Sequence, residues 1–281
     1  MPDIYEIVTN RIIEQLDKGI VPWRKPWAIK KAVNYVTGKP YRGINMLLLD
    51  EGEYASFNQI KKAGGKVKKG AKSEIVVFYQ TIEKKSKDEV DENGDPVIVT
   101  KRIFRYTPVF KIGEQTEGLE LRHTDKQIST IISGEQVSKS YLTRENISVS
   151  SGKKASYSPK EDKITVPHIS NFDSSSDYYA TLYHEMVHST GHESRLKRDI
   201  KNKFGDDKYS KEELIAELGG AFLCAETGIK IDYTNTSAYI GSWKKRLKED
   251  KSLIVCASKQ AQKAVKLILG ETTSENESGG N

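Results

Sequence analysis

One short segment restricts the possible folds of this chain more than any other, the run HEMVH at residues 184–188. His184 and His188 are four positions apart, so a helix places their imidazoles one turn apart on the same face. The surrounding pattern predicts a helix over residues 177–190 that ends at Gly191. Three of the five histidines of the chain fall within nine residues here, which favours a shared metal ion.

The acid between these histidines indicates hydrolytic chemistry. Zn²⁺ suits the pair because it binds imidazole well and lowers the pKa of a bound water to ~7. Glu185 lies close enough to hold and deprotonate that water. The motif therefore predicts a gluzincin-like zinc metalloendopeptidase site with one Zn²⁺ per chain. Another divalent metal such as Mn²⁺ is one alternative, and histidines that bind no metal are the other.

A third protein ligand must come from outside this motif. The longer pattern H-E-x-x-H-x-x-G-x-x-H has its glycine at Gly191, but its last histidine position holds Ser194. This source is therefore excluded. His192 comes two positions too early, and we interpret it as a helix C-terminal or substrate-side residue.

The run SKEELIAELGGAFLCAE supplies acids on a following helix, predicted over residues 211–227. Glu213 and Glu217 are i, i+4 neighbours, so both can approach the site. Their E-x-x-A-E spacing is similar to an element of many zincins, in which the first acid binds the metal and the second orients a histidine. We therefore assign Glu213 to the metal and Glu217 to a hydrogen bond with a ligand histidine. The reverse assignment stays open, as does a capping box that joins Ser210 to Glu213.

Hydrophobic periodicity divides the chain into two parts and predicts the α+β class. Residues 1–115 are expected to form an α+β domain with a long antiparallel hairpin, built from EIVVFYQTI and PVIVTKRIFRYTPVF around an Asn93-Gly94 turn. The polar stretch 116–126 is predicted as a linker. Residues 127–270 are predicted as a mostly helical, zincin-like metallopeptidase domain with a small sheet, and the polar tail 271–281 as disordered. Helices are expected near 3–18, 45–49, 56–63 (with Ser56 as N-cap), 125–138, 177–190, 211–227, 236–249 and 253–269, and short strands near 146–149 and 163–166.

Positive charge is concentrated in the first part. The chain has a formal net charge of +6, and residues 1–115 hold 21 Lys and Arg against 15 Asp and Glu, whereas the other residues hold 24 against 24. Such an asymmetry suggests that the first part meets a polyanion.

Aromatic residues alternate with lysine and arginine in this basic part, which suits single-stranded DNA. Cations follow the phosphates, and rings stack on unpaired bases at ~1–3 kcal/mol per base. No base-reading motif is present, so the binding should be largely independent of sequence. The alternative is a solvated lysine face with Trp23 and Trp27 in the core. The candidate DNA-binding residues are Trp23, Arg24, Lys25, Trp27, Tyr35, Tyr41, Arg42, Lys66, Lys68 and Lys69.

Composition argues against membrane and secreted proteins. No apolar run approaches the ~20 residues needed to span a bilayer. The first residues include acids and are amphipathic, unlike the basic and then apolar layout of a signal peptide. Cys224 and Cys256 are the only cysteines and form no C-x-x-C pair. They are expected to be buried helix residues in a protein of the reducing cytoplasm.

Several segments, taken in order, make the chain resemble the ArdC-like antirestriction family of plasmids and mobile elements. They are PWRKPW, YRGIN, a lysine-glycine segment before VVF, VF…EQTEGL, YHEMVHSTGHESRL and EELIAELGGAFLC. The likeness covers about residues 3–270. It implies an N-terminal domain that binds single-stranded DNA and a C-terminal zincin domain similar to SprT-type proteases. It also implies protection of incoming DNA from host restriction during transfer.

Two functional hypotheses follow. In the first, the DNA-binding part delivers a metallopeptidase to an unidentified protein substrate on or near DNA. In the second, the chain is a non-catalytic shield for single-stranded DNA, and its metal is structural. The presence of Glu185 favours the first, because a structural site would need only its ligands. A DNA-associated protease unrelated to restriction is a further alternative.

Overall fold

The computed structural model describes six stretches of the chain, residues 3–24, 31–90, 96–122, 134–200, 207–230 and 237–271. For residues 81–90, 96–102, 207–210 and 237–238, the structure describes the backbone alone. Among the described helices, none combines the length and the apolar character needed to cross a membrane. Four features predicted from the sequence lie outside these stretches: Lys25, Trp27, the Asn93-Gly94 turn and the tail beyond residue 271.

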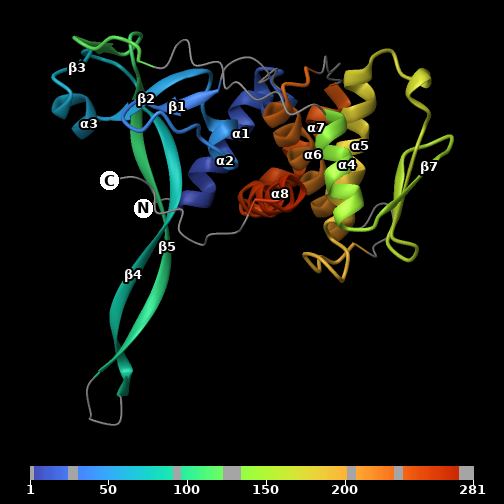
Figure 1. Cartoon of the computed structure of the whole chain (residues 1–281). Helices are drawn as coiled ribbons and strands as arrows, with labels where there is room; N and C mark the ends of the chain where they lie inside the picture. Colours follow the sequence, from blue (N-terminus) through green and yellow to red (C-terminus); the bar gives the residue numbers. More distant parts are fainter. Residues whose placement is uncertain are drawn as a thin grey trace.

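A four-stranded sheet in the order β1-β2-β5-β4 organises the first half. β1 (Ala32–Asn34) runs parallel to β2 (Gly52–Ser56), which lies antiparallel to β5 (Pro96–Lys111). β5 then pairs with β4 (Glu74–Val90) in a long antiparallel ladder. The ladder confirms the predicted hairpin, and Figure 1 shows that its far end projects well away from the helices.

The base of this hairpin is buried on both faces. Ile75 and Val77 belong to the main hydrophobic core, whereas Val76 and Val109 belong to a second, smaller cluster. Successive side chains of a strand point to opposite faces, so the apolar run of β4 fills both cores at once. The hairpin is therefore anchored at its base.

A smaller unit lies at the outer corner of the first half. α3 (Phe57–Lys62) begins with Ser56 as its N-cap, as predicted, and the structure adds a capping box in which Gln59 is the partner. β3 (Lys66–Val67) pairs with β6 (Thr116–Glu117), and Leu119 packs against the same small core. The linker predicted over residues 116–126 therefore starts too early, because its first residues complete this unit.

The second half consists of helices with a small sheet at one side, as the α+β prediction requires (Figure 1). Its sheet has the order β7-β9-β8, in which β9 is parallel to β7 and antiparallel to β8. The predicted helix at 125–138 is observed only from residue 134 onward, and residues 123–133 lie outside the described part. The elements are α4 (Gly134–Arg144), β7 (Ser148–Ser151), β8 (Ser156–Ser158), β9 (Lys163–Val166), η2 (Ile169–Asn171), α5 (Ser175–Ser189), α6 (Asp207–Thr227), α7 (Ser237–Glu249) and α8 (Leu253–Leu269).

One hydrophobic core joins the two halves. It contains residues of α1 (Ile4–Asp17), η1 (Pro22–Arg24) and α2 (Ile44–Leu48) together with residues of α5, α6, α7 and α8. Trp23 of η1 lies edge-on to Trp243 of α7, with ring centroids 6.0 Å apart. The predicted boundary therefore divides the sequence, but in the structure the two halves share a core.

Candidate metal centre

Two helices that approach closely bring the candidate ligands together. α5 buries Leu182, Met186 and Val187 and so directs its histidines toward α6. α6 carries Gly219 at the crossing, where an added Cβ would lie only 2.7 Å from a methyl carbon of Val187. The absence of a side chain at this position therefore allows the two helices to pack closely.

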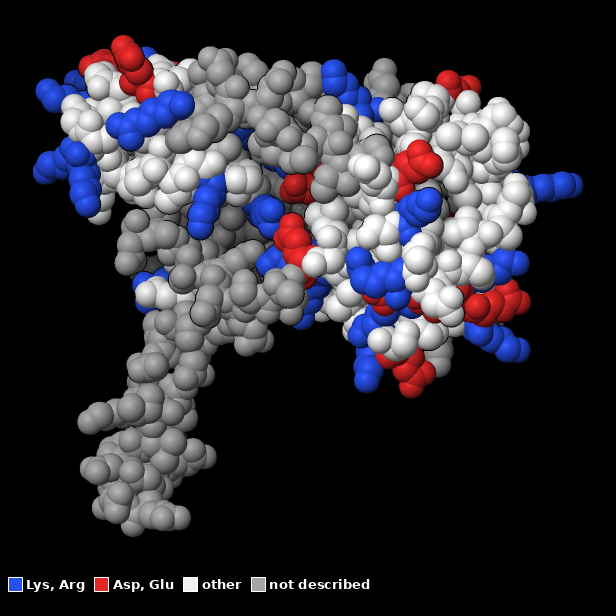
Figure 2. Space-filling model, viewed as in Figure 1, with Lys and Arg blue, Asp and Glu red and all other residues white. Residues whose placement is uncertain are grey.

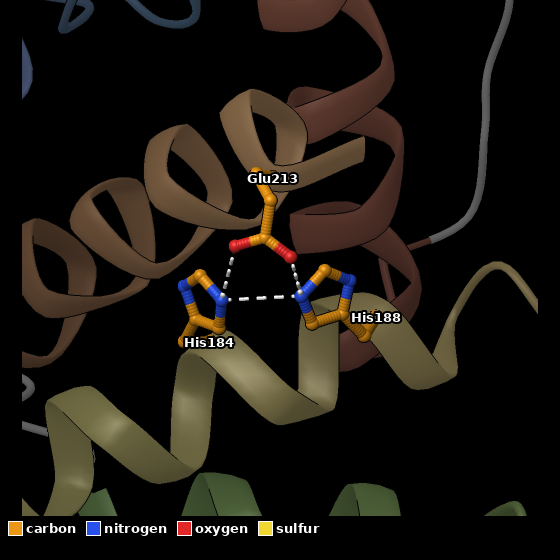
Figure 3. Close-up of side chains that lie close together, drawn as sticks. All are labelled: His184, His188 and Glu213. Carbon is orange, nitrogen blue, oxygen red and sulfur yellow. Dashed lines mark hydrogen bonds and ion pairs between the residues drawn. The ribbon is translucent and has the colours of Figure 1, made fainter. Parts of the chain in front are cut away.

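Three ligand atoms converge at this crossing (Figure 3). The Nε2 atoms of His184 and His188 are 3.1 Å apart. The carboxylate oxygens of Glu213 lie 3.5 Å from the first and 3.3 Å from the second. Ligands ~2.0–2.1 Å from a tetrahedral Zn²⁺ would be separated by about 3.3 Å, close to the spacing of the two nitrogens. Glu213 faces each nitrogen with a different oxygen, and one donor atom from each of the three residues lies within 4.8 Å of the others.

The same three side chains face solvent on one side. The exposed fractions are 26% for His184, 15% for His188 and 27% for Glu213. A catalytic zinc site has three protein ligands and keeps one position open for water or substrate. The partial exposure is compatible with this kind of site.

Glu185 lies beside the ligands on α5 and is only 7% exposed. Burial raises the pKa of its carboxyl group, and the nearby Glu213 charge adds to this, whereas His184 and His188 oppose it. The backbone N–H of Tyr157 in β8 lies near this carboxylate and also opposes the rise in its pKa. Sequence analysis missed β8, because its three residues are too short a run to show strand periodicity.

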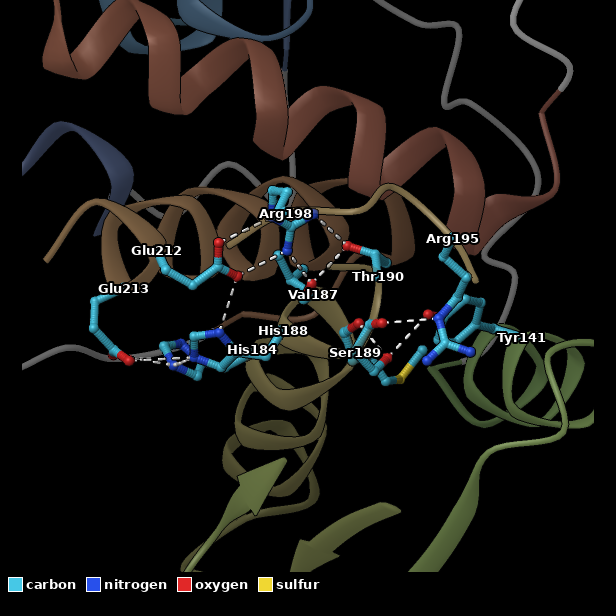
Figure 4. Close-up of polar contacts among 11 residues, drawn as sticks. Tyr141, His184, Val187, His188, Ser189, Thr190, Arg195, Arg198, Glu212 and Glu213 are labelled. Atoms are coloured by element: carbon cyan, nitrogen blue, oxygen red, sulfur yellow. Dashed lines mark hydrogen bonds and ion pairs between the residues drawn. The ribbon is translucent and has the colours of Figure 1, made fainter. Parts of the chain in front are cut away.

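A buried acid and a buried arginine hold His188 from behind (Figure 4). Glu212 Oε1 lies 3.2 Å from His188 Nδ1, on the side of the ring opposite Nε2. Arg198 contacts the same carboxylate through two nitrogens, at 2.9 and 2.8 Å. It also donates to the carbonyl of Val187 and to the hydroxyl of Thr190. Such a partner on the distal nitrogen selects the tautomer and the orientation of a ligand histidine.

These contacts correct the role predicted for Glu217. Its carboxylate lies 3.5 Å from Arg24, one turn beyond Glu213, and it is Glu212 that contacts the ligand histidine. The capping box at Ser210 is also wrong, because α6 begins at Asp207 and Ser210 lies inside the helix. The sequence carried one signal for Glu212, its position next to Glu213, whereas Arg198 had none.

The acids set the protonation of the histidine between them. Burial lowers the pKa of His188, but the hydrogen bonds that it donates to Glu212 and Glu213 outweigh this effect and raise the pKa to about 9. Burial raises the pKa of Glu213, and contacts with His184 and His188 outweigh it and lower the pKa. Burial also raises the pKa of Glu212, but its hydrogen bonds with His188 and Arg198 outweigh this effect and lower the pKa. Both acids are therefore ionised at neutral pH.

The C-terminal end of α5 is fixed by a second arginine. Arg195 donates to the carbonyl of Ser189 at 2.8 Å and pairs with Asp162 at 3.0 Å. His192 contacts Ser194 at 2.8 Å and takes no part in the three-residue cluster. The predicted substrate-side role of His192 stays a prediction.

The structure excludes the DNA-stacking role that was predicted for two aromatic residues. Trp23 and Tyr35 are each 1% exposed and belong to hydrophobic cores. Trp23 also donates a hydrogen bond to the hydroxyl of Tyr239 at 3.1 Å. A ring buried in this way cannot stack on a base. The alternative that placed Trp23 in the core is therefore correct, and Tyr35 is a core residue as well.

Other predicted DNA-binding residues have partners within the protein. Arg24 lies over the ring of Tyr239, 3.8 Å from its centroid, and Arg42 pairs with Glu271 at 2.9 Å. The half-buried hydroxyl of Tyr41 accepts a hydrogen bond from Asn34 at 3.3 Å. The exposed lysines of the prediction are Lys66, Lys68 and Lys69.

The fold and the site are those of a zincin-like protein, and comparisons with known proteins agree with this class. The second half matches the zincin-like metallopeptidase family over residues 138–260. The first half matches the N-terminal domain of anti-restriction factor ArdC over residues 2–110. The chain is thus a zincin-like metallopeptidase domain joined to an ArdC-type N-terminal domain.

Solved structures identify the family. The chain is similar to the antirestriction protein ArdC of plasmid R388 in its metal-free structure, with 35% identity, a TM-score of 0.73 and coverage of 96% of this chain and 98% of that chain. The Mn(II)-bound structure of the same protein gives 36% identity, a TM-score of 0.70 and coverage of 97% and 99%. The chain belongs to the ArdC family of antirestriction proteins.

Curated relatives include longer proteins. An uncharacterized protein of Sinorhizobium fredii, y4eC, is 30% identical over 92% of this chain and 89% of its own length. Two proteins of Escherichia coli named DNA primase TraC are 35% and 34% identical over 94% of this chain. The chain spans only 27% and 20% of their lengths.

Proposed function

We propose that this chain is a cytoplasmic antirestriction protein of a mobile element that binds single-stranded DNA and hydrolyses peptide bonds at a metal site. The observation that carries the proposal is the convergence of His184, His188 and Glu213 beside Glu185. The family and the TraC primases support a role near DNA in transfer. The proposed substrate is a protein bound to that DNA or close to it.

The donors on this chain fit a divalent ion. Two imidazoles and one carboxylate suit Zn²⁺, and they also accept Mn²⁺, the ion named for the R388 protein. Bound there, such an ion would polarise a peptide carbonyl and lower the pKa of water. His184, His188 and Glu213 would hold it.

Glu185 is the proposed general base and acid. Because its pKa is raised, its carboxylate takes up a proton more readily than an exposed acid and can return it to the leaving amine. The backbone N–H of Tyr157 stabilises the charged form of this carboxylate. Glu212 and Arg198 keep the ring of His188 in place while the proton moves.

The second candidate function is a non-catalytic shield whose metal is structural. One observation weakens it, because this fold matches both a metal-free and a Mn(II)-bound structure. A fold that persists without the ion does not depend on it in the way that zinc fingers do. A role for the ion in binding or catalysis is therefore favoured.

The deciding experiment replaces Glu185 by glutamine in the full chain, with the exposed Glu193→Gln as the matched control. We expect the Glu185→Gln variant to keep its metal content and to lose cleavage of an unfolded protein such as casein. If the same variant also fails to protect unmodified DNA in a restricting host, antirestriction depends on the peptidase activity. Full protection without cleavage would favour the shield.

A further inference from the structure

The burial of Trp23 and Tyr35 raises the question of which ring is available to a base. Phe57, the first residue of α3, is 57% exposed and is the most exposed large hydrophobic residue of the described chain. The Ser56–Gln59 capping box fixes the start of the helix on which it lies. Phe57 is therefore an apolar ring held in water by rigid backbone.

Lysines surround the exposed face of this short helix. Ile60 points inward to a small core, whereas Phe57, Lys61 and Lys62 are exposed. Because positions four apart share a helix face, Lys61 lies on the same side as Phe57. Lys66 of β3 and Lys69 follow directly and are also exposed.

These lysines are available to an external anion. Among the described residues, no ion pair joins Lys61, Lys62, Lys66 or Lys69 to an acid. Lys68 differs, because its ammonium donates to the carbonyls of Gly113 and Glu114, at 3.1 and 2.9 Å. It therefore helps to close the loop, and we exclude it from the predicted phosphate contacts.

The acids at this corner do not neutralise the group formed by Lys61, Lys62, Lys66 and Lys69. Glu114 is paired with Lys111 at 2.6 Å. Glu117 stands opposite Lys66 in the β3–β6 pair, without an ion pair between them. Figure 2 shows the resulting group of blue side chains, with a few red ones, at the corner where Figure 1 places α3 and β3.

We propose that this corner binds single-stranded DNA, with Phe57 stacking on a base and Lys61, Lys62, Lys66 and Lys69 contacting phosphates. A ring that offers only its apolar surface, next to unpaired cations, suits a strand whose bases are unstacked. A duplex hides its base faces and leaves the ring without a partner. The inference rests on the proposed function and locates its DNA site.

The test uses the full chain, because α1 and Trp23 pack on the C-terminal helices. A fluorescent oligo(dT) strand is titrated at several salt concentrations against wild type, Phe57→Ala and Phe57→Trp. We expect Phe57→Ala to weaken binding about 5- to 150-fold at every salt concentration, the effect of one stacked base, and Phe57→Trp to retain it. Tyr106→Ala, at an aromatic residue of β5 that is 43% exposed, is the matched control.

The lysines are tested by a different measurement. Changing Lys61, Lys62, Lys66 and Lys69 together to glutamine should flatten the slope of log affinity against log salt by up to about 3, or ~0.7 per phosphate. The same change at four exposed lysines of the second half, Lys139, Lys153, Lys154 and Lys160, controls for net charge. Thermal melting of each variant shows whether it is folded.

The outcomes separate the two proposals. A wild type without salt-dependent affinity for the strand refutes the DNA role itself. A wild type that binds, with Phe57→Ala equally tight or Tyr106→Ala equally weakened, refutes this site and leaves the DNA role intact. If wild type binds a blunt duplex as tightly as the single strand and Phe57→Ala does not change the affinity, the corner is a general polyanion-binding surface. That result would also refute the proposed site.

Discussion

Replacing Glu212 by glutamine tests how this metal centre holds its second histidine. The amide has the size of the carboxylate but lacks its charge. It leaves Arg198 facing a neutral group, where the structure has contacts of 2.9 and 2.8 Å. It also weakens the 3.2 Å contact with His188 Nδ1, which orients the ring.

The size of the effect follows from the burial of this pair. The Glu212 and Arg198 side chains are 9% and 7% exposed, so water cannot replace the lost interaction. Loss of a carboxylate behind a ligand histidine typically costs 10–100-fold in metal affinity, or about 1.4–2.8 kcal/mol. Charged hydrogen bonds contribute about 1.5–3 kcal/mol to folding. The melting temperature without metal should therefore fall by roughly 3–12 °C.

The assay is a Zn²⁺ titration of the full chain in competition with a chromogenic chelator. We expect Glu213→Ala to lose the most affinity and Glu212→Gln to lose 10–100-fold. Glu217→Gln should bind as wild type, because its carboxylate faces Arg24. A Glu212→Gln variant with wild-type affinity, or a Glu217→Gln variant weaker than it, would refute this account of the site.

Three further predictions concern metal, helix packing and the buried tryptophan. Chelation should lower the melting temperature of wild type but not of the His184→Ala, His188→Ala double variant, because the ion binds the folded state; a Zn²⁺-dependent shift of the double variant in calorimetry would contradict the ligand assignment. Gly219→Ala should reduce the free energy of unfolding by about 1–3 kcal/mol, since its Cβ would lie 2.7 Å from a methyl carbon of Val187; unchanged denaturant stability would mean that α5 and α6 separate easily. Trp23→Ala should lower the free energy of unfolding by about 3–5 kcal/mol. Where the variant is folded, its affinity for oligo(dT) and the salt dependence of that affinity should equal those of wild type. Weaker binding at wild-type stability would mean that Trp23 contacts DNA.

Local rules were sufficient for the features that depend on neighbouring residues. The i, i+4 spacing of His184 and His188 places both rings on one helix face whatever surrounds that helix. The β-branched and aromatic residues of β4 and β5, on either side of an Asn-Gly turn signal, predicted their pairing, because this composition is visible within a few residues. The N-cap at Ser56 is equally local, because it depends on residues within one turn.

Only the tertiary structure could decide which acid stands behind His188 and which rings are buried. Glu212, Glu213 and Glu217 all lie on α6, and the angle and depth at which α6 crosses α5 select among them. That crossing depends on the contact of Gly219 with Val187, and Arg198 reaches Glu212 from a loop between the helices. Burial of a tryptophan is likewise set by partners far along the chain, since Trp23 packs against residues of α7 more than two hundred positions later. Such contacts have no periodic trace in the sequence, because they arise from packing between segments that the local pattern does not connect.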